Sequence, residues 1–68
     1  MRVTLNGEPR ELPGSARVID AVVESGAEPT GRGVAVAVDG EVVPRGEWDG
    51  LVLRDGQRIE VLQAVQGG

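Results

Sequence analysis

The sequence lacks the side chains on which much protein chemistry depends. It contains no cysteine, no histidine and no lysine, and its one tryptophan is its only aromatic residue. Without cysteine it forms no disulfide, and without cysteine or histidine it has no ligand set for a structural zinc or haem site. The same absences exclude Cys–His and Ser–His nucleophiles and Schiff-base lysines. We therefore expect no such site, and a protein that functions by being recognised.

The charge balance is acidic. The 68 residues carry 7 basic side chains, all arginine, and 11 acidic ones, a net charge of −4. Such a chain lacks the basic patch and the stacking surface that nucleic-acid binding requires. No apolar run reaches the roughly 18 residues of a membrane span, and no signal-peptide pattern follows Met1. We expect one soluble, cytoplasmic domain that binds neither nucleic acid nor membrane.

The N-terminal residues predict a hairpin. Polar and apolar side chains alternate over residues 2–6, which is typical of a half-buried strand. Asn6-Gly7 predicts a type I′ turn, because this turn needs positive φ at both positions. The mostly charged segment from about Glu8 to Pro13 then predicts an edge strand.

A helix is predicted after Ser15, whose hydroxyl suits an N-cap. Its apolar stripe consists of Val18, Ile19, Val22 and Val23. Gly26 is expected to end the helix, since glycine readily adopts the left-handed C′ conformation. The glycine- and proline-containing segment Ala27–Gly33 is expected to form a loop.

The second half predicts further strands. The apolar run Val34–Val38 favours an interior strand covered on both faces, with valines on one side and alanines on the other. Asp39-Gly40 predicts another hairpin turn before a short strand, Glu41–Val43. Leu51–Leu53 is expected to form a short strand or a single turn, and Arg58–Leu62 the last strand. One helix on one face of a mixed sheet is an α+β roll.

Few polar groups suggest chemistry of their own. Four carboxylates lie in pairs near turns, Asp39 with Glu41 and Glu47 with Asp49, and we interpret them as solvated rather than as acid–base or metal sites. Gly31-Arg32-Gly33 lacks the spacing of a phosphate-binding loop and is interpreted as a flexible loop. Arg32 and Arg45 are interpreted as solvated, with contact to an acidic partner as the alternative. Trp48 is assigned a partly buried packing role rather than that of an exposed anchor.

The C-terminus is the strongest functional feature. The chain ends in Gln66-Gly67-Gly68, shortly after the last predicted strand. Glycine has no Cβ, so the tail 66–68 is thin and flexible enough to enter another protein's buried site. There the Gly68 carboxylate is open to attack. A frayed terminus is the simpler interpretation of Gly-Gly alone, but its place at the end of a small hairpin–helix–strand domain favours function.

Two internal stretches and the C-terminus carry a family resemblance. They are Ala35–Trp48, which contains the pattern V-V-P-R-x-x-W, Asp55–Val61, and Gly67-Gly68. Through these stretches, and over essentially its whole length, the sequence resembles the ThiS family, sulfur carriers of thiamine thiazole biosynthesis within the MoaD/ThiS ubiquitin-like proteins. The resemblance implies that residues 1–68 form a single β-grasp domain, the fold of ubiquitin.

The resemblance also implies a mechanism centred on Gly68. A ThiF-like adenylyltransferase uses ATP to adenylate the Gly68 carboxylate. A sulfur donor such as a cysteine desulfurase then replaces AMP with sulfur. The resulting thiocarboxylate passes its sulfur to a ThiG-like thiazole synthase. In this scheme the protein is a co-substrate rather than an enzyme, and it binds no cofactor or metal of its own.

Strand alternation suggests a docking surface beside the tail. If Ile59 and Val61 face the core, Leu62 and Ala64 face the other way. An exposed apolar face next to the reacting end suits a protein partner. We hypothesise that the surface is formed by Leu62, Ala64 and Val65.

Three other functions stay open at this point. A MoaD-like small subunit of molybdopterin synthase shares the fold and the thiocarboxylate, although Pro44-Arg45-x-x-Trp48 and the short length favour the thiazole pathway. A ubiquitin-like modifier would instead be conjugated through Gly68 to lysines of target proteins. A plain interaction module would carry its Gly-Gly by chance. Nothing in the sequence demands self-association.

Overall fold

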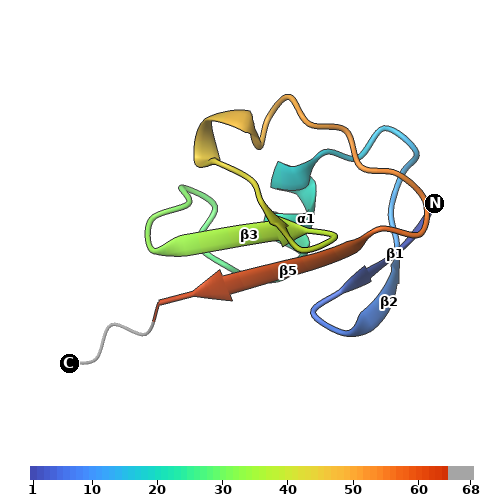
Figure 1. The fold of residues 1–68 in the computed structure, drawn as a ribbon, viewed down its shortest axis with the longest axis horizontal. Coiled ribbons are helices and arrows are strands. Elements are labelled where there is room, and N and C mark those ends of the chain that lie inside the picture. Colours follow the sequence, from blue (N-terminus) through green and yellow to red (C-terminus); the bar gives the residue numbers. More distant parts are fainter. Residues whose placement is uncertain (65–68) are drawn as a thin grey trace.

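Five strands form one mixed sheet in the computed structural model, which describes residues 1–64. The strands are β1 (Arg2–Leu5), β2 (Glu8–Glu11), β3 (Val34–Val38), β4 (Glu41–Val42) and β5 (Arg58–Gln63). Their order across the sheet is β2-β1-β5-β3-β4 (Figure 1). β1 and β5 run parallel, and all other neighbours run antiparallel. The last strand in sequence is therefore the central strand of the sheet.

A single α-helix, α1 (Val18–Glu24), lies on one face of the sheet and packs against β5 (Figure 1). The chain between β4 and β5 passes over the same side and includes a short 3₁₀ turn, η1 (Arg45–Glu47). The predicted α+β roll is confirmed. Both predicted hairpin turns are confirmed too, because Asn6 and Asp39 have positive φ angles of 50° and 49°.

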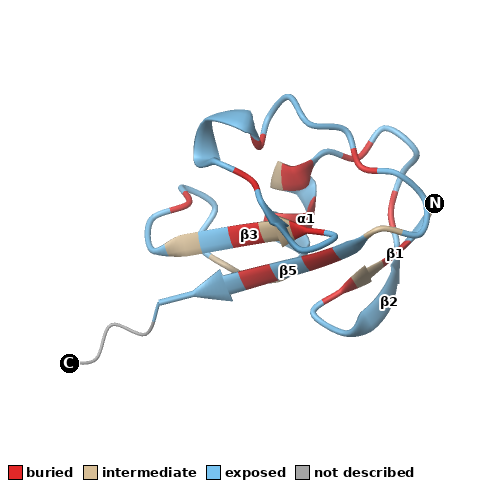
Figure 2. Cartoon of the chain, viewed as in Figure 1, coloured by how far each residue is buried: buried red, intermediate tan, exposed pale blue. Residues whose placement is uncertain are grey.

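The hydrophobic core lies between the sheet and these covering segments. Burial alternates along β3 and β5, so that Val36, Ile59 and Val61 face inward while their chain neighbours do not (Figure 2). The buried set is Val3, Leu5, Leu12, Ala16, Val18, Ala21, Val22, Val36, Val38, Val43, Trp48, Leu53, Ile59 and Val61. No polar or charged residue among those described is buried, so apolar burial is the main source of cohesion.

The start of the helix differs from the prediction. Ser15 lies in a turn, and the N-cap residue is Arg17. The backbone N–H of Arg17 donates to Oδ2 of Asp20 at 2.8 Å, so the first turn is capped by a carboxylate three residues into the helix rather than by the serine. The end is as predicted, because Gly26 has a φ of 82° just after the C-cap Ser25.

The buried face of the helix differs from the predicted apolar stripe at two positions. Val23 is 57% exposed, and Ala21 is buried instead, beside Val18 and Val22. Residues at i, i+3 and i+4 share one helix face. Val23 lies about 100° further round and points away from the sheet.

Two strand predictions need correction. β3 is an interior strand but is covered on one face only, since Ala35 is exposed and Ala37 is half-buried. Residues 51–53 form no strand of the sheet. Val52 makes an isolated bridge to Arg17, and the Leu53 N–H donates to the Ala16 carbonyl at 2.8 Å. This segment therefore pairs with the residues at the start of the helix and not with the sheet.

Trp48 is more deeply buried than predicted. Only 3% of its surface is exposed, and its indole Nε1–H donates to the Val43 carbonyl at 3.0 Å. The buried ring therefore leaves no polar group of its own unpaired.

We predict that Trp48→Phe lowers the free energy of unfolding by about 1–3 kcal/mol, because it leaves the Val43 carbonyl without its donor in a buried site. Urea unfolding followed by circular dichroism measures this loss. Val42→Ala is the control, since Val42 is 77% exposed and its loss should stay within about 0.5 kcal/mol. Equal losses in the two variants would contradict a stabilising role for the buried hydrogen bond.

Candidate functional site

β5 ends at a corner of the molecule, on the far side from the N-terminus (Figure 1). There the segment between α1 and β3 approaches it. The Ala64 N–H donates to the Gly33 carbonyl at 2.7 Å. The Glu28 N–H donates to Oε1 of Gln63 at 3.1 Å. Two hydrogen bonds from one loop therefore hold the last described residues of the chain.

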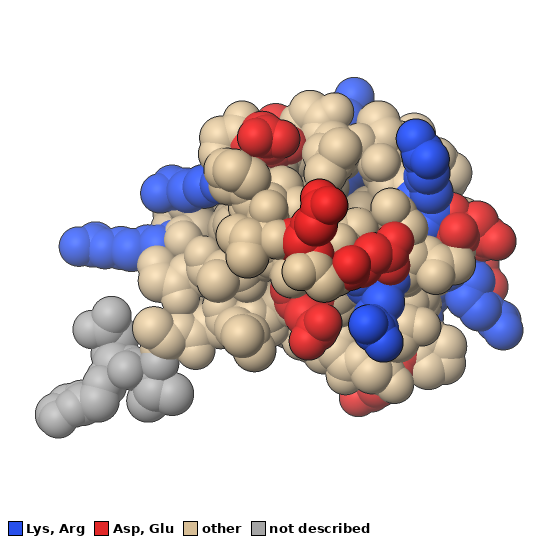
Figure 3. Space-filling view, viewed as in Figure 1, with Lys and Arg blue, Asp and Glu red and all other residues tan. Residues whose placement is uncertain are grey.

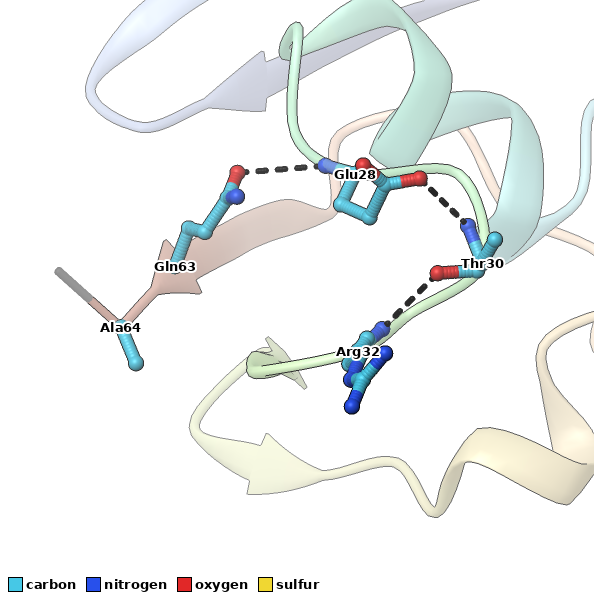
Figure 4. Close-up of a pocket in the computed structure, with 5 residues that line it drawn as sticks. All are labelled: Glu28, Thr30, Arg32, Gln63 and Ala64. Carbon is cyan, nitrogen blue, oxygen red and sulfur yellow. Dashed lines mark hydrogen bonds between the residues drawn. The ribbon is translucent and has the colours of Figure 1, made fainter. Parts of the chain in front are cut away.

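A shallow hollow of about 500 Å³ opens beside these contacts (Figure 4). It is lined by Glu28, Thr30, Arg32, Gln63 and Ala64. The backbone N–H of Arg32 donates to Oγ1 of Thr30 at 3.4 Å, and that of Thr30 lies 3.5 Å from Oε1 of Glu28. Side chains of this loop thus fold back onto its own backbone, which shapes the loop around the end of β5.

The loop itself is supported by a glycine that has no room for a side chain. Gly31 is buried and has a φ of 79°. A Cβ at this position would lie 2.8 Å from both Nε of Arg45 and Cζ3 of Trp48. Arg45 and Trp48 are therefore packed directly against the backbone of the loop. The sequence-based interpretation of this glycine as part of a flexible loop missed this packing.

The sheet face opposite α1 is open, and its apolar side chains lie next to the end of β5. Leu62 is 68% exposed and is paired directly with Ala35 on β3. Val42 is 77% exposed and is paired with Ala37. Directly paired residues share a face of the sheet. We call the apolar strip formed by Ala35, Ala37, Val42 and Leu62 the open-face strip.

Figure 3 shows acidic and basic side chains spread among uncharged residues over this view of the molecule. On β5, Arg58 and Glu60 are exposed and share the open face with Leu62. This face is thus an apolar strip with a charged rim, the usual composition of a protein-binding surface.

The predicted site residues fall into two groups. Leu62 and Ala64 are exposed, and Ile59 and Val61 face the core, as the alternation predicted. Val65, Gln66, Gly67 and Gly68 lie outside the described residues, so the predicted reacting end and one docking residue stay predictions.

Two further observations concern the described part of the chain. Within residues 1–64 no three carboxylates gather closely enough to hold a metal ion. No helix in this range is long and apolar enough to cross a membrane.

Sequence reasoning missed the loop contacts around Gln63. Glu28 and Gln63 are separated by 35 positions, and no local pattern pairs a strand-end glutamine with a loop amide. The available signal was the positive-φ requirement of a glycine-containing loop, which marks unusual backbone but does not say what packs against it.

Comparison with known proteins identifies similar chains. A model of the ThiS family matches residues 3–68. A crystal structure of the thiamine biosynthesis protein (ThiS) from Geobacter metallireducens is similar with a TM-score of 0.78 and 28% sequence identity, over 100% of both chains. A solution NMR structure of a thiamine biosynthesis protein from the same organism gives a TM-score of 0.77 at 28% identity, over 100% of this chain and 88% of that one. No curated protein matches. These similarities confirm the predicted family resemblance and the β-grasp fold.

We predict that Gly31→Ala lowers the free energy of unfolding by about 2–4 kcal/mol, because it adds left-handed strain to overpacking against the buried indole ring. Gly40→Ala is the matched control. Gly40 has a φ of 84° but open space around its Cβ position, so only the strain of about 1 kcal/mol applies. Urea unfolding of both variants gives the difference, and equal losses would contradict the packing of Arg45 and Trp48 against this loop.

Proposed function

The chain belongs to the ThiS family, and from that membership we propose that the carboxylate of Gly68 is its site of chemistry. Membership supports a role as a sulfur carrier in thiamine biosynthesis. The observation that carries the finer proposal is the extent of the family match, which runs from residue 3 to residue 68 and so includes the terminal Gly-Gly.

The proposed chemistry follows from the weakness of a carboxylate as an electrophile. An oxygen of the Gly68 carboxylate attacks the α-phosphorus of ATP, pyrophosphate leaves, and an acyl-adenylate forms. The terminal sulfur of a persulfide on the donor then attacks the acyl carbon, and AMP leaves. A thiol reductant cleaves the S–S bond of the resulting acyl disulfide. The product is a thiocarboxylate, whose sulfur is a soft nucleophile.

The catalysis is assigned to partner enzymes. The small size of the family's carriers is consistent with a protein that is not an enzyme. We propose a ThiF-like adenylyltransferase that uses ATP, a sulfur donor such as a cysteine desulfurase, and a ThiG-like thiazole synthase as its partners. Gly67 and Gly68 carry no side chain, which lets a narrow active site accept the end of the chain.

We propose that the open-face strip and Ala64 form the docking surface for these partners, with Val65, which lies outside the described residues, as a further contact residue. Leu62 lies in β5, six positions before Gly68 and three before Val65. A partner that covers Leu62 therefore holds the domain close to the reacting end. The open-face strip has an apolar centre and a charged rim, which supports a protein rather than a small molecule as the group that binds there.

We predict that the intact protein, after co-expression with its pathway enzymes, gains the mass difference between sulfur and oxygen. The increase should map to the C-terminal peptide. It should also form in vitro with ATP, an adenylyltransferase and a sulfur source. An unchanged mass under both conditions would contradict the proposal.

Stable adducts on lysines of other proteins would indicate a ubiquitin-like modifier instead. Co-purification with a molybdopterin synthase large subunit, and not with a thiazole synthase, would indicate the MoaD-like role.

We predict that Leu62→Glu weakens binding to the adenylyltransferase by about tenfold or more, because it places a charge in the centre of an apolar contact. Titration calorimetry measures the change. Val23→Glu is the matched control, since Val23 is also exposed but lies on α1, on the other side of the sheet. Unchanged binding of Leu62→Glu to both the adenylyltransferase and the thiazole synthase would remove Leu62 from the docking surface.

A further inference from the structure

We propose that Gln63 is a positioning residue that holds the chain in place immediately before the segment carrying Gly68. The proposal rests on the proposed function and adds a residue to it. Gln63 ends β5, and the chain has five more residues, Ala64 to Gly68. Its side chain is exposed and is not part of the hydrophobic core. Its hydrogen bond to the loop is therefore not a consequence of core packing.

The first step is the bond itself. Oε1 of Gln63 accepts the Glu28 N–H at 3.1 Å, across 35 positions of sequence. The next residue, Ala64, donates its N–H to the Gly33 carbonyl at 2.7 Å. Figure 4 shows the Gln63 side chain reaching across to the loop at Glu28. One side-chain bond and one backbone bond therefore tie two consecutive residues at the end of β5 to the same loop, residues 28–33.

The second step is that this loop is itself anchored to the core. Gly31 packs against Nε of Arg45 and Cζ3 of Trp48, with no room for a Cβ. The Gly31 carbonyl accepts the Val34 N–H at 3.0 Å, which links the loop to β3. A continuous series of contacts thus runs from the buried indole ring through the loop to Gln63. It gives the pattern Pro44-Arg45-x-x-Trp48 a structural role at the reacting end of the protein.

The third step is why a fixed starting point matters. Four residues follow Ala64, and their fully extended reach is roughly 13 Å. A partner that holds the open face must find the Gly68 carboxylate within that radius. Fixing Ala64 fixes the point from which that reach is measured, which raises the effective concentration of the carboxylate at the partner's active site. A loosened Gln63 leaves docking intact but makes fewer docked complexes productive.

The test compares two variants of the full-length chain. Gln63→Met keeps the length of the side chain and removes the acceptor. Gln57→Met is the matched control, because Oε1 of Gln57 accepts the Arg54 N–H at 2.7 Å, an equivalent bond in a turn away from the loop. Pyrophosphate release by the adenylyltransferase is measured while the concentration of each variant is varied. Hydrogen exchange at the Glu28 amide reports whether the bond to Gln63 has been lost, and urea unfolding reports whether both variants remain folded.

We expect Gln63→Met to lower kcat by about three- to tenfold, the equivalent of one hydrogen bond, while KM stays within about twofold and the Glu28 amide exchanges faster. Gln57→Met should match the wild type in kcat. A wild-type kcat for Gln63→Met, or an equal fall for Gln57→Met, would overturn the positioning role while leaving the proposed function in place. A wild-type protein that releases no pyrophosphate at all would remove both.

Discussion

The structure depends on the pairing of β5 with β1 on one side and β3 on the other. The last strand of the chain is the centre of the sheet, and its inward side chains, Ile59 and Val61, are buried against the rest of the core. Folding is therefore completed only when the C-terminal part of the chain is in place. A strand bonded along both edges is also the best-supported element in a sheet. On the β1 side this pairing covers Arg58 and Ile59, whereas on the β3 side it continues to Gln63.

The two faces of the sheet have different roles. One face is buried in the core, and the other stays exposed to solvent. Residues 1–64 form one short α-helix, and the sequence has one tryptophan. These can cover only one face of the sheet in a protein of this size. The other face keeps Leu62 and Val42 in solvent. In an isolated protein this exposure stabilises nothing. An exposed apolar face is useful to a protein that binds several partners one after another. The proposed sulfur carrier has to bind and release both an adenylyltransferase and a thiazole synthase.

The loop between α1 and β3 connects the two sides. Its packing against Trp48 and Arg45 belongs to the stability of the core, whereas its bonds to Gln63 and Ala64 belong to the end of β5. The same few residues therefore contribute to the core and hold the end of β5. Substitutions in this loop should be interpreted with both measurements in hand, since a loss of stability and a loss of positioning have different kinetic consequences.

Local patterns in the sequence were enough to determine the two hairpin turns, the alternation along β5, the helix end at Gly26 and the family. Each of these features depends on residues that are close together in the sequence, or on the identity of single residues. The tertiary structure decided the rest. It selected Ala21 over Val23 for burial, left one face of β3 open, buried Trp48 fully, and brought Glu28 to Gln63. These outcomes depend on which distant segments meet, and a hydrogen bond across 35 positions leaves no periodicity in the sequence. The same limit applies to Gly31, whose lack of room for a side chain arises only when Arg45 and Trp48 pack against it.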